Sequence, residues 1–357
     1  MKDIKKAIIA MSGGVDSSVA ALLMKNKNVD CIGVTMKLIG DETIKISPTC
    51  CSDKDIDDAK KIAKALGFEH HIFNFSSNFK EKVVDNFVYC YENGMTPNPC
   101  IECNRFLKFD KLFSEANKLG GDCVVTGHYA RVENDEKSGR YLLKKAVDAS
   151  KDQTYVLYSL TQEQLSRACF PLGDLDKEQV RKIAADNGFI NADKKDSQDI
   201  CFIKDCKYHE FIEQYTGKLY PEGNFVDTEG NVLGKHKGII RYTVGQGKKL
   251  GLILKEPMYV CQIRPDTNEV VLCYHEQLFK TELRAKSINL ISVPRIDGEM
   301  RIKAKIRYRQ TEAPATVTQL SDDEIRVVFD EPQRAITSGQ SIVMYDGDTV
   351  VGGGIII

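Results

Sequence analysis

A loop rich in glycine and serine near the N-terminus, Ser12-Gly-Gly-Val-Asp-Ser-Ser18, has the residue types that bind phosphate. The two glycines let the backbone come close to an anion, and the serines add hydroxyl donors. A helix that begins here would also offer its N-terminal N–H groups and the positive end of its dipole. Neither G-x-x-x-x-G-K-[ST] nor G-x-G-x-x-G is present. The loop therefore predicts a nucleotide site of another kind, and the alternative is a strand-to-helix turn capped by serines.

Cysteines in two other segments could supply sulfur chemistry. Residues 96–109 contain Cys100 and Cys103, and prolines at 97 and 99 keep the approach to them extended. We expect a helix to begin there, and its N-terminus would lower the pKa of the Cys103 thiol and make it a better nucleophile. Cys201 follows much later, between a polar turn and an apolar run. The spacing alone does not indicate that Cys103 and Cys201 meet.

The elements around these residues alternate between strand and helix in the first half of the chain. Residues 7–11, 31–36 and 123–126 are short apolar runs typical of buried strands. Residues 53–67 and roughly 105–119 have apolar side chains at helical spacing. This order predicts an α/β fold with a doubly wound parallel sheet, which binds ligands at the carboxyl ends of its strands.

The pattern becomes β-rich beyond about residue 210. Strands are predicted over residues 226–233, 238–243, 258–264, 270–274, 301–310, 315–320, 325–329, 341–345 and 350–357. They indicate a small, mainly β central domain and a C-terminal antiparallel β-barrel, with a break near residues 280–283. We therefore expect three domains, at residues 1–208, 209–281 and 282–357.

Composition limits the possible functions. The 50 Lys and Arg residues against 51 Asp and Glu residues give a net charge of −1, which argues against a general polyanion binder. No apolar run is long enough for a membrane span, and the N-terminus does not resemble a signal peptide. We expect a cytoplasmic protein, whose 12 cysteines are mostly buried or chemically active rather than paired in disulfides. Adjacent Cys50 and Cys51 are expected to pack.

One short segment could still provide a basic face for nucleic acid. Residues 301–309 alternate strictly between Arg or Lys and apolar or aromatic residues. On a strand, this places five cations on one face at about 6.6 Å intervals. The alternative is a solvated edge strand protected by its charges. Residues 235–249 are a second basic stretch without an acidic residue.

With these motifs in view, the sequence resembles the tRNA-specific 2-thiouridylases of the MnmA family, within the PP-loop ATP pyrophosphatase superfamily. The resemblance runs from about residue 10 to residue 354. The matching segments are residues 10–17, Met36, and residues 96–109, 126–130, 151–153, 196–202, 307–310 and 339–340.

The resemblance implies ATP-dependent adenylation of the C2 oxygen of a wobble uridine, with Mg²⁺, followed by sulfur transfer. Cys201 would carry a persulfide received from a cysteine desulfurase or sulfur-relay protein, and Cys103 would be the nucleophile that releases the sulfur. A Cys103–Cys201 disulfide would remain. The implied ATP contacts are Ala10, Met11, Ser12, Gly13, Gly14, Val15, Asp16 and Ser17, with Met36 and Gly127 nearby. The implied tRNA contacts are Asn98, Pro99 and Cys100 at the target base, together with His128, Lys151, Asp152, Gln153, Arg307, Tyr308 and Gln340.

Cys100 departs from the pattern, because many relatives have aspartate at this position. Cys100, Cys103 and Cys201 together supply three thiolates, the number that holds a [4Fe–4S] cluster with one open iron in some related tRNA thiolases. A zinc site completed by Cys206 or His209 is a further alternative, although its spacing is poor for zinc. At the level of function, the alternatives are a PP-loop synthetase acting on a small molecule and a non-catalytic RNA-binding protein.

Overall fold

The N-terminal part is built on a five-stranded parallel sheet in the order β3-β2-β1-β4-β7. The computed structural model describes residues 4–40, 53–194, 200–203 and 206–357, so Cys50, Cys51 and residues 196–199 lie outside the described residues. The strands are β1 (Lys6–Ala10), β2 (Asp30–Lys37), β3 (His70–Asn74), β4 (Cys123–Val125) and β7 (Ala168–Cys169). All four pairings are parallel, which confirms the α/β prediction. The chain adds β2 and β3 on one side of β1 and then β4 and β7 on the other side. The strand order therefore switches between β1 and β4, and sheets of this kind bind ligands at such a switch point.

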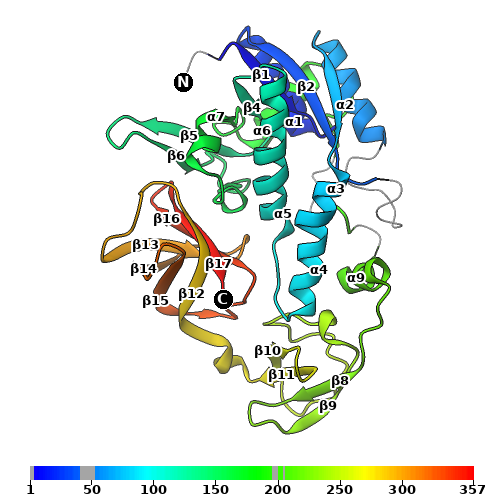
Figure 1. The fold of residues 1–357 in the computed structure, drawn as a ribbon, viewed down its shortest axis with the longest axis vertical. Helices are drawn as coiled ribbons and strands as arrows, with labels where there is room; N and C mark the ends of the chain where they lie inside the picture. The colour runs from blue at the N-terminus through cyan, green and yellow to red at the C-terminus, as the bar shows by residue number, and fades with distance from the viewer. Residues whose placement is uncertain (1–3, 41–52, 195–199, 204–205) are drawn as a thin grey trace.

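Helices cover this sheet and extend away from it (Figure 1). The helices near the sheet are α1 (Val15–Asn26), α2 (Asp53–Ala65), α6 (Leu112–Lys118), α7 (Gln162–Arg167) and α8 (Lys177–Asp186), with the 3₁₀ turn η3 (Thr154–Val156). Two longer helical stretches form an arm. The first contains α3 (Ser76–Phe79), the π-helical η1 (Lys80–Val84) and α4 (Asp85–Glu92). The second contains α5 (Pro99–Glu102) and the π-helical η2 (Cys103–Lys111), and continues into α6.

The second stretch begins earlier than the apolar periodicity predicted, at Pro99 instead of near residue 105. Asn98 is its N-cap and accepts a hydrogen bond from the Cys100 amide at 3.1 Å. Pro99 occupies the first helical position, where its missing N–H costs nothing. The helix therefore starts at the cysteine motif itself.

The central part contains α9 (Tyr208–Thr216) and a four-stranded sheet in the order β10-β11-β8-β9. Its strands are β8 (Gly223–Val226), β9 (Val232–His236), β10 (Tyr259–Arg264) and β11 (Glu269–Cys273). The strand predicted over 226–233 was wrong, because Asp227 accepts hydrogen bonds from the amides of Glu229 and Asn231 and turns the chain between β8 and β9. The strand predicted over 238–243 was also wrong, since it contains the 3₁₀ turn η4 (Ile239–Arg241).

The C-terminal part is an antiparallel barrel of six strands in the order β12-β15-β14-β13-β16-β17, closed by pairing between β12 and β17. The strands are β12 (Phe279–Leu290), β13 (Glu299–Lys305), β14 (Ala313–Gln319), β15 (Glu324–Arg334), β16 (Ser341–Asp346) and β17 (Thr349–Ile356), and η5 (His275–Leu278) precedes them. The prediction of a barrel is confirmed. Residues 280–283 lie in its first strand. A hairpin of β5 (Ala130–Asp135) and β6 (Arg140–Lys145) from the N-terminal part extends the barrel sheet, with Lys144 paired to Thr349.

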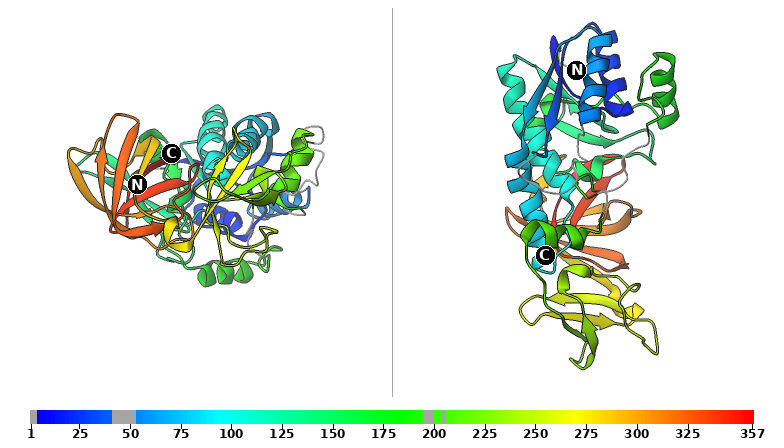
Figure 2. Two further views of the ribbon diagram at one scale, coloured as in Figure 1. Left: turned by 90° about the horizontal axis from the view of Figure 1, so that it is seen from below. Right: turned by 90° about the vertical axis from the view of Figure 1, so that its right-hand side faces the viewer.

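The three parts are arranged around the helical arm (Figures 1 and 2). The parallel sheet lies at one end, the central sheet at the other, and the barrel beside the arm between them. Every helix within the described ranges is too short or too polar to cross a membrane. This arrangement brings the start of α5 and the loops of the barrel together in the middle of the molecule.

Candidate active site

The loop between β1 and α1 has its shape fixed by its own side chains. The Ser17 and Ser18 hydroxyls donate to the Gly14 carbonyl at 3.0 and 2.9 Å, and the Ser12 amide donates to Ser17 Oγ at 3.2 Å. Gly13 has a φ of +73°, and a Cβ there would collide with the Asp55 carbonyl. The N-cap of α1, Gly14, has no capping side chain. The loop is thus rigid and leaves the helix N-terminus available for an anion.

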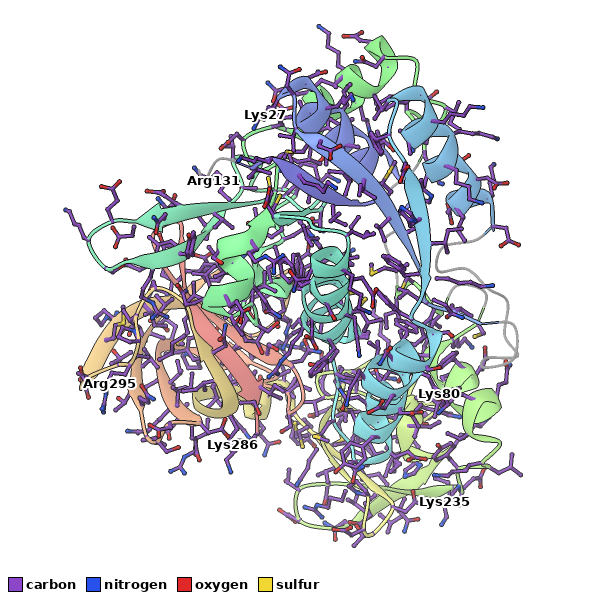
Figure 3. The ribbon with its side chains drawn as sticks, turned by 45° about the horizontal axis from the view of Figure 1, so that its top comes forward. Lys27, Lys80, Arg131, Lys235, Lys286 and Arg295 are labelled. Atoms are coloured by element: carbon purple, nitrogen blue, oxygen red, sulfur yellow. The ribbon has the colours of Figure 1, made fainter. Side chains whose placement is uncertain are left out.

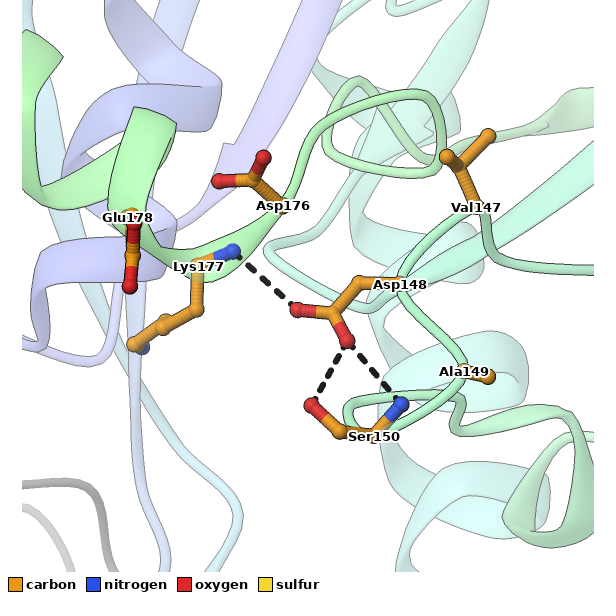
Figure 4. Close-up of a pocket in the computed structure, with 7 residues that line it drawn as sticks. All are labelled: Val147, Asp148, Ala149, Ser150, Asp176, Lys177 and Glu178. Carbon is orange, nitrogen blue, oxygen red and sulfur yellow. Dashed lines mark hydrogen bonds between the residues drawn. The ribbon is translucent and has the colours of Figure 1, made fainter.

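Asp16, in the first turn of α1, is held by two residues that the sequence analysis missed. Its carboxylate accepts a hydrogen bond from Tyr129 Oη at 2.8 Å and from Lys177 Nζ at 2.7 and 2.9 Å. Lys177 begins α8 and is largely buried. Figure 4 shows its backbone amide donating to Asp148 while its side chain extends away from Asp148. No local motif marks Lys177, because its partner is 161 positions away in the sequence.

Asn191 and Lys194 support the same loop from behind. Asn191 Nδ2 donates to the Gly13 carbonyl and to Ser18 Oγ, both at 3.0 Å. Lys194 Nζ donates to the Gly13 carbonyl at 3.0 Å and pairs with Asp55 and Asp58. Sequence reasoning missed this support too. It ties the nucleotide loop to the segment that leads to Cys201.

The residues after β4 pack directly on the nucleotide loop. A Cβ on Gly127 would lie 2.7 Å from the backbone of Asp16 and Ser17, so only glycine allows this close approach. His128 is 7% exposed, and its Nδ1 lies 2.7 Å from Thr126 Oγ1. Burial holds the pKa of His128 well below its ordinary value, and the charge of Lys108 lowers it further. Met36 is buried near the end of β2.

Cys100 and Cys103 occupy different environments on one helix. Cys100 lies in the first turn of α5, whereas Cys103 follows α5, begins the π-helical segment and is 9% exposed. The effect of a helix N-terminus is confined to the first turn. Cys100, not Cys103, lies in that turn. The prediction that the helix N-terminus lowers the pKa of the Cys103 thiol was therefore wrong about which cysteine is placed there.

Cys201 lies close enough to Cys100 for their charges to interact. The pKa of the Cys100 thiol is raised, first by partial removal from water and then by Cys201. Cys201 is partly buried, and the next residue, Phe202, packs edge-on against Phe79 and Phe87 of the arm. The structure therefore brings together two cysteine segments whose proximity the spacing alone did not indicate.

Barrel and loop residues surround this thiol site. Tyr308 Oη donates to the Asp152 carbonyl at 3.4 Å, and burial, Asp152 and Cys100 raise the pKa of Tyr308. Gln153 exchanges two hydrogen bonds with the backbone of Tyr129, the residue that bonds to Asp16. Lys151, two residues earlier, is half-buried. The structure thus brings the 151–153 segment, the barrel loop and Cys100 to one site beside the nucleotide loop.

Comparison with known proteins agrees with this arrangement. The family model described as the tRNA methyl transferase HUP domain matches residues 5–205, the tRNA methyl transferase PRC-barrel domain matches residues 209–274, and the aminomethyltransferase beta-barrel domain matches residues 280–356. The tRNA-specific 2-thiouridylase MnmA of Clostridioides difficile is 52% identical over 99% of this chain and 98% of its own length. The chain belongs to the MnmA family. The MnmA of Lachnoclostridium phytofermentans is 49% identical over 99% of this chain and all of its own length.

In this MnmA-family chain, Gln340 and Arg307 bind the protein's own backbone. Gln340 Nε2 donates to the Thr96 carbonyl at 2.9 Å and joins the barrel to the segment before Asn98. Arg307 Nη2 donates to the carbonyls of Arg334 and Ala335, both at 2.7 Å. Both side chains position the barrel and its loop in this structure.

The prediction of five cations along one strand at residues 301–309 was wrong. β13 ends at Lys305, because the Gln310 side chain accepts a hydrogen bond from the Ile306 amide and turns the chain. Arg301 pairs with Asp330 through two hydrogen bonds, of 2.8 and 2.6 Å. Lys305 is largely buried beside Glu312 and the Tyr345 ring. Figure 3 shows basic side chains such as Lys235, Lys286 and Arg295 spread over the central part and the barrel.

The positions of Cys100, Cys103 and Cys201 bear on whether these thiols could hold a metal ion or cluster. Among the described residues, no three Cys, His, Asp or Glu side chains form a group that could hold a metal ion. Cys103 packs in the apolar core, while Cys100 keeps accessible surface. His209, the alternative zinc ligand, is buried on α9. The described positions therefore do not fit a cluster or a zinc ion.

Proposed function

We propose that this protein is an ATP-dependent tRNA 2-thiouridylase. The observation that carries the proposal is the joining of Cys100, Cys201 and Tyr308 at one site beside a rigid PP-loop, in a chain about half identical to MnmA proteins over its full length. A nucleotide loop alone would suit many ATP pyrophosphatases. The nearby thiols favour sulfur transfer among them.

Adenylation is the first proposed step. ATP would bind residues 10–17 with Mg²⁺ on its phosphates, and Met36 and Gly127 would flank the nucleotide. The C2 oxygen of the target uridine attacks the α-phosphorus, the bond from that phosphorus to the bridging oxygen breaks, and pyrophosphate leaves with the electron pair. The step converts a poor leaving group into AMP.

Sulfur transfer is the second step. A persulfide on Cys201, supplied by a cysteine desulfurase or relay protein, attacks C2 with its terminal sulfur. The Cys103 thiolate attacks Cys201 Sγ and forms a disulfide as the terminal sulfur leaves, and AMP departs from C2. A thiol reductant then returns two electrons to the disulfide. No step is assigned to an iron–sulfur cluster, because the described cysteine positions do not fit one.

The proposed substrate contacts follow the same site. Asn98, Pro99 and Cys100 would face the base, and Lys151, Asp152, Gln153 and Tyr308 would contact the tRNA around it. His128 is buried beneath the site, so its contribution to tRNA binding would require that surface to open. Gln340 and Arg307 would act by positioning the barrel.

The test is to incubate the protein with tRNA, ATP, Mg²⁺ and a cysteine desulfurase with cysteine, and to measure 2-thiouridine and AMP. We expect equal amounts of both products. The variant Cys201→Ser should make no 2-thiouridine and still bind ATP, whereas the neighbouring control Cys206→Ser should remain active. AMP formation that is independent of tRNA would instead favour a synthetase acting on a small molecule, and ATP binding without turnover would favour a non-catalytic RNA-binding protein.

A further inference from the structure

Lys108 lies on the helix that carries both cysteines of the C-x-x-C motif. It is half-buried in the π-helical segment η2, five residues after Cys103. Hydrogen bonds in a π-helix join residues five apart, so this geometry brings Lys108 back toward the face of Cys103. In an α-helix, a residue five positions on would face well away. The π-helical segment therefore directs Lys108 toward the thiol site.

The side chains around Lys108 connect it to the nucleotide loop. The next residue, Phe109, packs against the buried His128 ring, with centroids 6.0 Å apart. His128 follows Gly127, whose backbone packs on Asp16 and Ser17. The positive charge of Lys108 also lowers the pKa of both His128 and Cys100. Its ammonium group is therefore within electrostatic range of Cys100 and of His128, the residue next to Gly127.

The other cations of the site already have partners in the protein. Lys177 pairs with Asp16, Lys194 pairs with Asp55 and Asp58, and Arg307 binds two carbonyls. Lys108 has no hydrogen bond or ion pair with any residue that the structure describes. The ammonium group of Lys108 is therefore available to an anion that binds at the site.

We propose that Lys108 is a catalytic residue of the adenylation step, whose ammonium group donates a hydrogen bond to a non-bridging oxygen of the ATP α-phosphate. This inference rests on the proposed function. Negative charge grows on the phosphate oxygens as the uridine C2 oxygen attacks and pyrophosphate departs. A cation beside the reacting phosphate in a partly dry site stabilises that charge more strongly than one in water. Lys108 gains no proton and loses none in this step.

The test compares Lys108→Met, which keeps the apolar stem, with Lys108→Arg and with the exposed lysine on the same helix, Lys111→Met. Pyrophosphate release is measured at saturating tRNA and ATP, together with the affinity for each substrate and thermal unfolding. We expect Lys108→Met to lower the maximal rate of pyrophosphate release by about a hundredfold or more, with thermal unfolding unchanged and ATP affinity reduced much less than the rate. Lys108→Arg should recover part of the rate, and Lys111→Met should match the wild type.

Two results would overturn the proposal. One is pyrophosphate release at the wild-type rate in Lys108→Met, including the case in which only the later sulfur transfer slows. The other is weaker tRNA binding with an unchanged maximal rate, which would make Lys108 a simple phosphate contact. A wild-type protein that forms no 2-thiouridine would refute the proposed function instead, so the two failures are distinguishable.

Discussion

Lys177 Nζ lies 2.7 and 2.9 Å from the two carboxylate oxygens of Asp16, and so places a lysine from α8 against the nucleotide loop. The lysine side chain is 11% exposed and the aspartate side chain 29% exposed, so water screens this pair only in part. Asp16 is an acidic residue in a loop expected to bind the negative phosphates of ATP. Lys177 offsets that charge before the nucleotide arrives.

Replacing Lys177 with Met should therefore weaken ATP binding. A hydrogen bond to a charged group contributes about 1.5–3 kcal/mol, so we expect a loss of affinity of about tenfold or more. Titration calorimetry with a non-hydrolysable ATP analogue would measure it. Lys182→Met, at an exposed position of the same helix, is the control. The double variant Asp16→Asn, Lys177→Met should bind better than Lys177→Met alone, and equal affinities would contradict charge compensation.

Arg307 and Lys303 should have separate effects because their environments differ. Arg307 is half-buried and binds two carbonyls, so Arg307→Ala should lower the free energy of unfolding by about 2–4 kcal/mol. Lys303 is exposed on β13, so Lys303→Gln should leave stability unchanged. If Lys303 contacts a tRNA phosphate, its loss should reduce the salt dependence of tRNA binding by about one unit of slope. Denaturant unfolding and binding titrations at several salt concentrations would separate these effects, and an unchanged stability of Arg307→Ala would contradict its positioning role.

The sequence predicted what depends on local pattern. The apolar run at residues 7–11 and the loop after it required only neighbouring residues, and β1 and the nucleotide loop lie where expected. The cation spacing of residues 301–309 failed because Gln310 turns the chain, a side-chain contact that periodicity does not encode. The joining of β6 to β17 and the supports of Asp16 and Gly13 connect residues far apart in the sequence. Such contacts arise only when the domains pack.

Cys100 should not be required for catalysis if sulfur travels on Cys201. We expect anaerobically purified protein with full thiolation activity to lack iron and acid-labile sulfide, and Cys100→Ser to remain active, because the described cysteine positions do not form a metal-binding group. Iron and sulfide analysis beside the 2-thiouridine assay would measure this. A brown, iron-containing protein whose activity is lost with Cys100→Ser would establish the cluster route instead.

His70 should make the protein less stable in mild acid. Thr35 Oγ1 donates its proton to the Met11 carbonyl at 2.7 Å, so His70 Nε2, at 2.8 Å, must be the donor to Thr35. His70 Nδ1 is then unprotonated, and it is buried without a partner among the described residues. Burial, followed by the charges of Lys60 and His71, lowers the pKa of His70 from 6.5 to about 4.

The sign of the effect follows from which state binds the proton. Between pH 6.5 and about 4, the unfolded chain binds a proton at His70 that the folded protein does not. The stability that neutral His70 provides is therefore complete above pH 6.5 and decreases as the pH falls toward 4. His70→Gln keeps a donor for Thr35 but cannot be charged, so its free energy of unfolding should depend less on pH in this range. The neighbouring His71→Gln, at a more exposed side chain, is the matched control. Parallel pH profiles for the wild type and His70→Gln would contradict the assignment. Because Thr35 bonds the residue before the nucleotide loop, ATP affinity should weaken only as the pH approaches about 4, where His70 of the folded protein takes up its proton, and it should weaken less in His70→Gln.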